Sequence, residues 1–201
     1  DNQQLTGESG REYAYDTVIL ALGSVTTYFG IEGLEAYSFG IKSEQDIERL
    51  KRHIYDQLQQ PKGMDKDYVI IGAGPTGVEL AAAMSSYLQR LCDKHRIKNH
   101  PIRVHLVEAA PRVLPRMSER ASKRVKKRLH KLGVKVHTNQ KVEKQTADTL
   151  MVNGKPMKSH TVIWTSGVAT HPFYDKYPEL FARSKRHKVA VDEYMQVVDG
   201  V

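Results

Sequence analysis

Three glycines at GxGxxG spacing are the residues that point most directly to chemistry. Gly72, Gly74 and Gly77 follow the apolar run 68–71 and open a stretch of helical periodicity. The first glycine permits a tight turn, the second lets a pyrophosphate approach the backbone, and the third allows close helix–strand packing. The helix N-terminus adds free N–H groups and a positive dipole end. The expected contacts to a dinucleotide phosphate are Gly72, Gly74, Pro75, Thr76 and Gly77.

An acidic residue ends the next expected strand. Glu108 ends the alternating stretch 102–108, and a carboxylate there accepts hydrogen bonds from the adenosine ribose and repels a 2′-phosphate. The sequence therefore favours NADH over NADPH, although Arg112 weakens that preference. The spacing from Gly77 exceeds the roughly 20 residues of the simple fingerprint, and a charged insert at 92–101 accounts for the excess. A glycine turn without a ligand is the alternative, which the strand–turn–helix context disfavours.

Two further residues have an ordinary structural explanation beside a functional one. Glu79 stands in the first turn of the expected helix, where a glutamate commonly compensates the dipole. The spacing favours that explanation over a carboxylate near the nicotinamide or a second substrate. Gly167 follows an apolar run, and a turn glycine and a glycine that admits a cofactor are equally supported. The scattered histidines form no HExxH, and GxSxG is absent, so we expect no metal site and no serine nucleophile.

The expected elements alternate between strands and helices. A buried strand is predicted within 11–23, and Ser43 with Asp46 caps a helix that Pro61 to Gly63 end. Short segments with turns at 147–148 and Asn153-Gly154 predict a three-stranded antiparallel meander. The order βαβαβ, meander, β predicts an α/β fold with a Rossmann-like parallel sheet. Strands are expected at 11–23, 68–71, 102–108, 134–138, 141–146, 149–152, 155–158 and 161–165, helices at 43–60, 76–91 and 118–132, and a glycine-rich connection at 24–40.

Composition limits the class of protein. Of the 201 residues, 40% are apolar and 27% are charged, which is typical of a globular protein, and no apolar run reaches the length of a membrane span. The single cysteine, Cys92, excludes a CxxC redox pair within this sequence. The formal net charge of +8 is concentrated in 94–103 and 116–135. A solvated helix face is the favoured explanation, with nucleic acid or an anionic membrane as alternatives. Aromatic residues are not interleaved with these cations, which disfavours single-stranded nucleic acid.

The two ends of the sequence predict a piece of a longer polypeptide. The first residue is Asp1, residues 1–10 resemble the loop of a β-hairpin, and residues 195–201 break off after a strand-like stretch.

Five motifs occur in one order along the sequence. They are YDTVILALGS at 15–24, FGIEGL at 29–34, GAGPTGVEL at 72–80, VEAAPRVLP at 107–115 and WTSGV at 164–168. As a set, covering about 13–173, they resemble type II NADH dehydrogenases of the two-dinucleotide, pyridine nucleotide-disulfide reductase superfamily. The resemblance implies an FAD-dependent enzyme that passes hydride from NADH to FAD and electrons to a membrane quinone without pumping protons.

The resemblance also implies roles for individual residues. The three glycines of the turn would hold the NADH pyrophosphate, and Glu108 the ribose. Glu79 matches a family glutamate near the nicotinamide and the quinone side of the flavin, which makes it the catalytic candidate. Gly23 and Gly167 would lie near the flavin and nicotinamide. The implied domains are a stub of the FAD-binding domain at 1–42, an NADH-binding domain at 43–170 and a return stub at 171–201.

Departures from the family pattern shape the expectation. The N-terminal FAD-binding GxGxxG, the later glycine-aspartate motif and the C-terminal membrane-binding helices are not in this sequence. We therefore expect an NADH-binding module that is inactive alone, with FAD held mostly outside it. The full-length protein is expected to be peripheral to the cytoplasmic side of the cell membrane, to use a quinone, to bind no nucleic acid and to form a possible homodimer.

Three alternatives stay open. One is another FAD-dependent NAD(P)H oxidoreductase, such as a ferredoxin-reductase-like or persulfide-type flavoprotein. A second is a non-catalytic dinucleotide sensor, for which Glu79 and the stubs would be unneeded. The third is a nucleic-acid or membrane role for the basic helix at 118–132.

Overall fold

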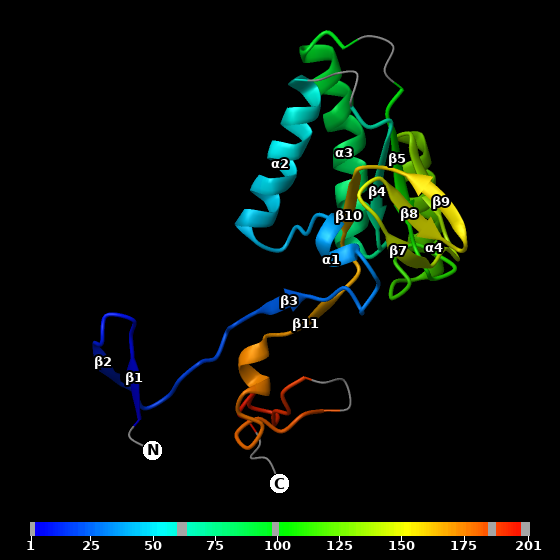
Figure 1. Ribbon diagram of the computed structural model, residues 1–201. Helices are drawn as coiled ribbons and strands as arrows, with labels where there is room; N and C mark the ends of the chain where they lie inside the picture. Colours follow the sequence, from blue (N-terminus) through cyan, green and yellow to red (C-terminus); the bar gives the residue numbers. More distant parts are fainter. Residues whose placement is uncertain (1–2, 60–63, 98–100, 185–187, 198–201) are drawn as a thin grey trace. The chain divides into compact units, whose positions relative to one another are not determined.

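The computed structural model describes residues 3–59, 64–97, 101–184 and 188–197 (Figure 1). The chain divides into two compact units, one of residues 1–25 with 170–201 and one of residues 26–169. Strands β3 (Ser24–Thr26) and β11 (Val168–Thr170) form a two-stranded sheet. The larger unit contains the glycine turn.

A four-stranded parallel sheet forms the centre of the larger unit. Its order is β10-β4-β5-β6, and each neighbouring pair is parallel. The strands are β4 (Asp67–Ile71), β5 (Arg103–Val107), β6 (Val134–His137) and β10 (Thr161–Trp164), and the crossover helices are α3 (Pro75–Lys94) and α4 (Glu119–Lys131). This topology confirms the predicted Rossmann-like α/β fold.

The sheet separates two apolar cores. Successive strand residues point to opposite faces, so Leu106 packs in one core and Val107 in the other. Helices α2 (Glu44–Gln59), α3 and α4 contribute to the first core, with Leu88 fully buried at its centre. The short helix α1 (Leu34–Tyr37) and the meander contribute to the second. Burial on both faces explains why these strands are continuous apolar runs.

Helix α2 begins with the expected cap. The Asp46 N–H donates to Ser43 Oγ, and the Ser43 N–H donates to the Asp46 carboxylate, both at 3.1 Å. Aspartate therefore completes the capping box in place of the usual Glu or Gln. Leu50, Ile54 and Leu58 are buried at helical spacing along α2. The predicted stop at Pro61 to Gly63 lies outside the described residues.

The predicted meander is confirmed. Strands β7 (Val142–Gln145), β8 (Thr149–Val152) and β9 (Lys155–Lys158) pair antiparallel in the order β7-β8-β9. Asn153 and Gly154 both have positive φ, 46° and 70°, as a two-residue type I′ hairpin turn requires.

The predicted buried strand within 11–23 is wrong. Strand β1 (Gln4–Thr6) pairs with β2 (Glu12–Ala14) around the expected hairpin loop, but residues 15–23 form no strand. The run contains exposed apolar side chains, and Ile19 is 87% exposed. A strand that is apolar on both sides needs neighbours at its edges and cover on both faces. No strand of the described residues pairs with this run.

Two smaller expectations are also corrected. Helix α3 continues to Lys94, so part of the expected connection at 92–101 is helical, because Leu88 and Cys92 extend the buried stripe by one turn. The glycine-rich connection at 24–40 contains β3 and α1, where the fully buried Leu34 anchors the short helix. Within the described ranges, no helix combines the length and hydropathy required to cross a bilayer.

Candidate functional site

The glycine turn joins β4 to α3, and two of its glycines are required by close packing. Gly72 has φ +104°, and a Cβ there would overlap the Ser166 hydroxyl. A Cβ on Gly77 would overlap the Gly72 carbonyl oxygen and lie 2.7 Å from Thr165 Oγ1. A side chain at Gly72 would displace the segment after β10, and one at Gly77 would push α3 away from the end of β4. Gly77 therefore has the packing role that a dinucleotide turn assigns to its third glycine.

Gly74 has a different environment. Its backbone is extended, with φ −69° and ψ −178°, and nothing lies within 4 Å of the position that a Cβ would occupy. It is the N-cap of α3, makes no side-chain cap, and is followed by Pro75, which has no N–H. The N–H groups of this first turn have no intrahelical acceptor. Open space beside them fits the approach of a pyrophosphate.

Glu108 ties the glycine turn to the loop after β5. One carboxylate oxygen accepts from the Ala73 N–H at 2.6 Å, and the other accepts from the Ala110 N–H at 2.8 Å. Each carboxylate oxygen can accept more than one hydrogen bond. Glu108 can therefore hold the turn in place and still accept from a ribose hydroxyl.

A cavity of about 410 Å³ lies next to this carboxylate. Its walls include Ile71 and Val107 from the strand ends, Trp164 from β10 and Val142 from the meander. The volume suits a small-molecule group. Strands β5 and β6, which follow β4 in sequence, lie on one side of β4, and β10 lies on the other side. The strand order therefore reverses at β4, which is the switch point of the sheet. Ligands of open α/β sheets bind at the carboxyl ends of strands at such a point.

A second cavity of about 340 Å³ contains Thr76 from the start of α3 together with Thr165 and Gly167. The Thr165 hydroxyl is 2.8 Å from the carbonyl oxygen of Ile71 and 3.0 Å from that of Gly72, so it fixes the exit of β4. Lys42 also lines this cavity. Among the described residues that line this cavity, Lys42 is the one with a cationic side chain, which could bind a phosphate or carboxamide group of a ligand.

Sequence reasoning missed Thr165, Ser166 and Lys42. The signal for the first two was available, because parallel strands end at the same edge of a sheet. The segment after β10 must therefore lie beside the glycine turn after β4. No local pattern indicated Lys42, which precedes α2 by two residues.

Gly167 packs against the chain itself. A Cβ on it would overlap the Thr27 carbonyl oxygen and lie 3.0 Å from the Phe29 ring. The Thr27 N–H donates to the Gly167 carbonyl at 3.2 Å, and the Trp164 indole N–H donates to the Thr27 carbonyl at 2.8 Å. The packing explanation for this glycine has direct support, and Gly167 also lines the smaller cavity.

Two expected site residues are not brought to these cavities. Glu79 lies on α3 beyond its first turn, which contains no acidic residue, and its exposed carboxylate forms no hydrogen bond or ion pair with the residues that the structure describes. Its carboxylate is therefore available to another group. Gly23 belongs to the smaller unit, where it has φ +71° and open space around it.

Arg112 organises the loop that follows Glu108. Its guanidinium donates to the carbonyls of Pro115 at 2.6 Å, Met117 at 2.8 Å and Leu114 at 3.3 Å. These bonds occupy the side chain that was expected to weaken a preference for NADH.

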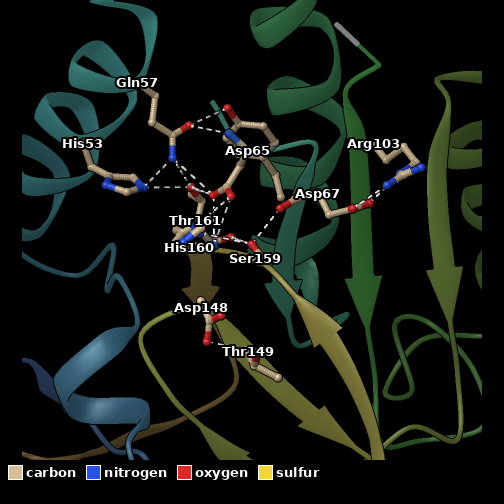
Figure 2. Close-up of polar contacts among 11 residues, drawn as sticks. His53, Gln57, Asp65, Asp67, Arg103, Asp148, Thr149, Ser159, His160 and Thr161 are labelled. Atoms are coloured by element: carbon tan, nitrogen blue, oxygen red, sulfur yellow. Dashed lines mark hydrogen bonds and ion pairs between the residues drawn. The ribbon is translucent and has the colours of Figure 1, made fainter. Parts of the chain in front are cut away.

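A buried polar cluster lies at the opposite, amino-terminal ends of β4 and β10 (Figure 2). The Asp65 carboxylate accepts from the Thr161 hydroxyl at 2.7 Å, the His160 backbone N–H at 3.0 Å and Gln57 Nε2 at 3.2 Å. Burial acts to raise the pKa of Asp65, but hydrogen bonds from Thr161 and His160 hold it below its usual value. Burial lowers the pKa of neighbouring His53. These bonds join α2 to the sheet, so we assign the cluster a structural role.

Among the residues that the structure describes, no group of three or more His, Cys, Asp or Glu side chains is placed to hold a metal ion.

Relatives of this chain are known from sequence. It is 29% identical over 195 residues to the type II NADH:quinone oxidoreductase of Staphylococcus haemolyticus, covering 92% of this chain and 48% of that protein. It is 24% identical over 216 residues to the external alternative NAD(P)H-ubiquinone oxidoreductase B1 of Solanum tuberosum, covering 98% and 37%. The chain thus spans less than half the length of either relative.

Solved structures share its fold. NDH2 of Plasmodium falciparum, solved in complex with NADH, superposes with a TM-score of 0.83 at 21% identity, covering 98% of this chain and 44% of that one. A family profile described as pyridine nucleotide-disulphide oxidoreductase matches residues 1–201. Because that match extends over every residue, the chain belongs to the pyridine nucleotide-disulphide oxidoreductase family.

Proposed function

We propose that this chain is the NADH-binding module of a flavin-dependent NADH dehydrogenase that delivers electrons to a quinone. The observation that carries the proposal is the glycine turn. Open space at Gly74 lies over a helix N-terminus, and Glu108, hydrogen-bonded to that turn, lines a cavity at the switch point of the sheet.

The residues fit the parts of NADH. The first turn of α3 would hold the pyrophosphate through backbone N–H groups, and Glu108 would accept from the adenosine ribose hydroxyls. The larger cavity, with Trp164 in its wall, suits the adenosine side. The smaller cavity, with Thr76, Thr165 and Gly167, suits the nicotinamide side.

A preference for NADH over NADPH is supported by Glu108 and Arg112, although Lys141 also lines the cavity beside Glu108. Glu108 would repel a 2′-phosphate, and Arg112 is hydrogen-bonded to three loop carbonyls instead of being free to attract one. The carboxylate that organises the turn is therefore also the group that selects the cofactor.

The reaction requires FAD, which supplies the group that accepts hydride from NADH and passes electrons onward. We infer that FAD is held mainly by parts of the full-length protein outside this chain, with Gly23 and Gly167 on the flavin and nicotinamide side. Glu79, exposed and free of partners within the described residues, is the candidate for a carboxylate beside the nicotinamide and the acceptor.

The electron acceptor is inferred from relatives. The staphylococcal relative is a quinone oxidoreductase and the potato relative a ubiquinone oxidoreductase. Such acceptors partition into the lipid bilayer, so the full-length protein would work at a membrane surface, on its cytoplasmic side. The homodimer implied by the family resemblance stays a prediction.

The test is an anaerobic titration of the purified full-length protein with NADH and, separately, NADPH, following flavin absorbance. We expect stoichiometric bleaching by NADH at lower concentration than by NADPH, and reoxidation by a water-soluble quinone analogue. NADH binding without bleaching would identify a dinucleotide sensor. Bleaching with reoxidation by ferredoxin, and none by the quinone, would identify a ferredoxin-reductase-like enzyme. Either result would refute the proposal.

A further inference from the structure

Helix α4 carries most of the chain's excess charge. Its sequence ERASKRVKKRLHK holds seven lysine or arginine residues against Glu119, which gives a net charge of +6 on one helix in a chain of formal net charge +8. This uneven distribution is not a property of the surface in general, so it calls for an explanation specific to α4.

Six of these cations form one stripe. They recur at helical spacing, are all exposed, and span about 16 Å at 1.5 Å per residue. The opposite face packs on the sheet through Leu129 and Val125, while the Ser122 hydroxyl donates to the Val113 carbonyl at 2.7 Å. The cationic stripe is therefore fixed outward; its members are Arg120, Lys123, Arg124, Lys127, Arg128 and Lys131.

The stripe is unfavourable for the isolated helix. Cations three or four residues apart repel one another, and within the described ranges none of the six forms an ion pair. Arg120 and Lys123 lie near the N-terminus, where the helix dipole disfavours positive charge. Only Glu119, four residues before Lys123, opposes this repulsion within α4. An anionic partner would relieve it.

The chemistry of the stripe distinguishes among anionic partners. It contains no Asn or Gln to read base edges and no aromatic side chain on which a base could stack. Met117, next to the helix start, is 48% exposed, and Pro115 beside it is exposed as well. Exposed apolar residues just before the start of a cationic helix suit the interface of a lipid bilayer better than a nucleic acid groove.

We propose that the α4 stripe binds the anionic phospholipid surface of a membrane and holds the NADH-binding module against it. This inference rests on the proposed function, because a bilayer-dissolved acceptor requires the enzyme to stay at the membrane. The stripe adds an electrostatic contact between this module and the membrane. The contribution of each cation to the membrane affinity falls as the salt concentration rises, because salt screens the charges.

The test is sedimentation of the FAD-loaded full-length protein with vesicles. Anionic vesicles of 30% phosphatidylserine in phosphatidylcholine are compared with uncharged vesicles of pure phosphatidylcholine, so that the two preparations differ in surface charge. The stripe variant carries Lys123→Gln, Arg124→Gln, Lys127→Gln and Arg128→Gln. The matched control removes four exposed cations elsewhere, through Lys51→Gln, Arg52→Gln, Lys155→Gln and Lys158→Gln.

We expect the stripe variant to lose at least about tenfold in partitioning to anionic vesicles, because each Lys or Arg at the surface contributes roughly fivefold. The control should change about twofold or less, and neither variant should alter partitioning to phosphatidylcholine. Equal losses in both variants would show a general charge effect and overturn the proposal. So would duplex DNA that displaces the wild-type protein from vesicles at equal phosphate concentration.

A second readout separates this inference from the proposed function. The stripe variant should retain wild-type turnover of NADH with a water-soluble quinone analogue and an unchanged melting temperature. If the wild-type protein reduces no quinone but still shows stripe-dependent vesicle binding, the proposed function is refuted and the proposal that the α4 stripe binds lipid is retained. If turnover is normal but vesicle binding does not depend on the stripe, only the proposal that the α4 stripe binds lipid is refuted.

Discussion

Substituting the second and third glycines of the turn should separate ligand approach from packing. In Gly77→Ala the new methyl would overlap the Gly72 carbonyl oxygen and lie 2.7 Å from Thr165 Oγ1. Ordinary contacts between heavy atoms need about 3.5 Å, so α3 must move away from the end of β4. Overpacking of this kind costs about 1–3 kcal/mol, which lowers Tm by several degrees.

Gly74→Ala should behave in the opposite way. Its methyl would enter space that is empty within 4 Å, and its φ of −69° suits alanine. The weaker N-cap and the lower entropy of the unfolded chain nearly cancel, so stability should change by less than about 1 kcal/mol. The methyl would stand where the pyrophosphate approaches, so NADH affinity should fall at least about tenfold.

The assay measures thermal unfolding without nucleotide and the Kd of NADH by fluorescence titration, for wild type and both variants. Gly77→Ala should lose stability before any ligand is added, whereas Gly74→Ala should lose affinity with its Tm nearly unchanged. A Gly74→Ala protein that binds NADH like wild type would refute the placement of the pyrophosphate. A Gly77→Ala protein of wild-type Tm would refute the close approach of α3 to β4.

Three further predictions concern stability and the loop beside the site. Leu88→Ala should lower the free energy of unfolding by about 2–5 kcal/mol in chemical denaturation, because Leu88 is fully buried in the helix-side core; a loss below about 1 kcal/mol would contradict its central position. The depressed pKa of Asp65 means that its contribution is present above its unfolded value near 3.8 and is lost as pH falls through the lower folded value. Asp65→Asn should therefore flatten the loss of stability below about pH 4, and an unchanged pH profile would rule out this origin. Arg112→Gln should weaken NADH binding severalfold by loosening the loop carbonyls of Leu114, Pro115 and Met117, without improving NADPH binding; improved NADPH binding, measured by parallel titrations, would contradict that reasoning.

Features that depend on local backbone conformation could be predicted from sequence. Gly72 and the Asn153-Gly154 pair have the positive φ angles that their turns require. Ser43 and Asp46 cap a helix through contacts three residues apart. In each case the residues that create the structure are neighbours in the chain, so their types and spacing carry the information.

Features that depend on distant partners could not be predicted in the same way. The stretch at 11–23 predicted a buried strand, but pairing partners decide whether its apolar part is buried, and no described strand pairs with residues 15–23. Thr165 and Ser166 reach the glycine turn only because β10 pairs with β4. Arg112 was expected to affect nucleotide preference by its charge, whereas its hydrogen bonds are made to loop carbonyls.

The cofactor preference of the full-length enzyme tests the central claim most directly. The measurement is the ratio of Kd values for NADPH and NADH in wild type, Glu108→Gln and Glu108→Arg. Glu108→Gln keeps the shape and one carbonyl acceptor but removes the charge, so it controls for disturbance of the bonds to Ala73 and Ala110. We predict a wild-type preference for NADH that Glu108→Gln reduces and Glu108→Arg reverses, at least about tenfold overall. An unchanged ratio in a folded Glu108→Arg enzyme would contradict the assignment of this site.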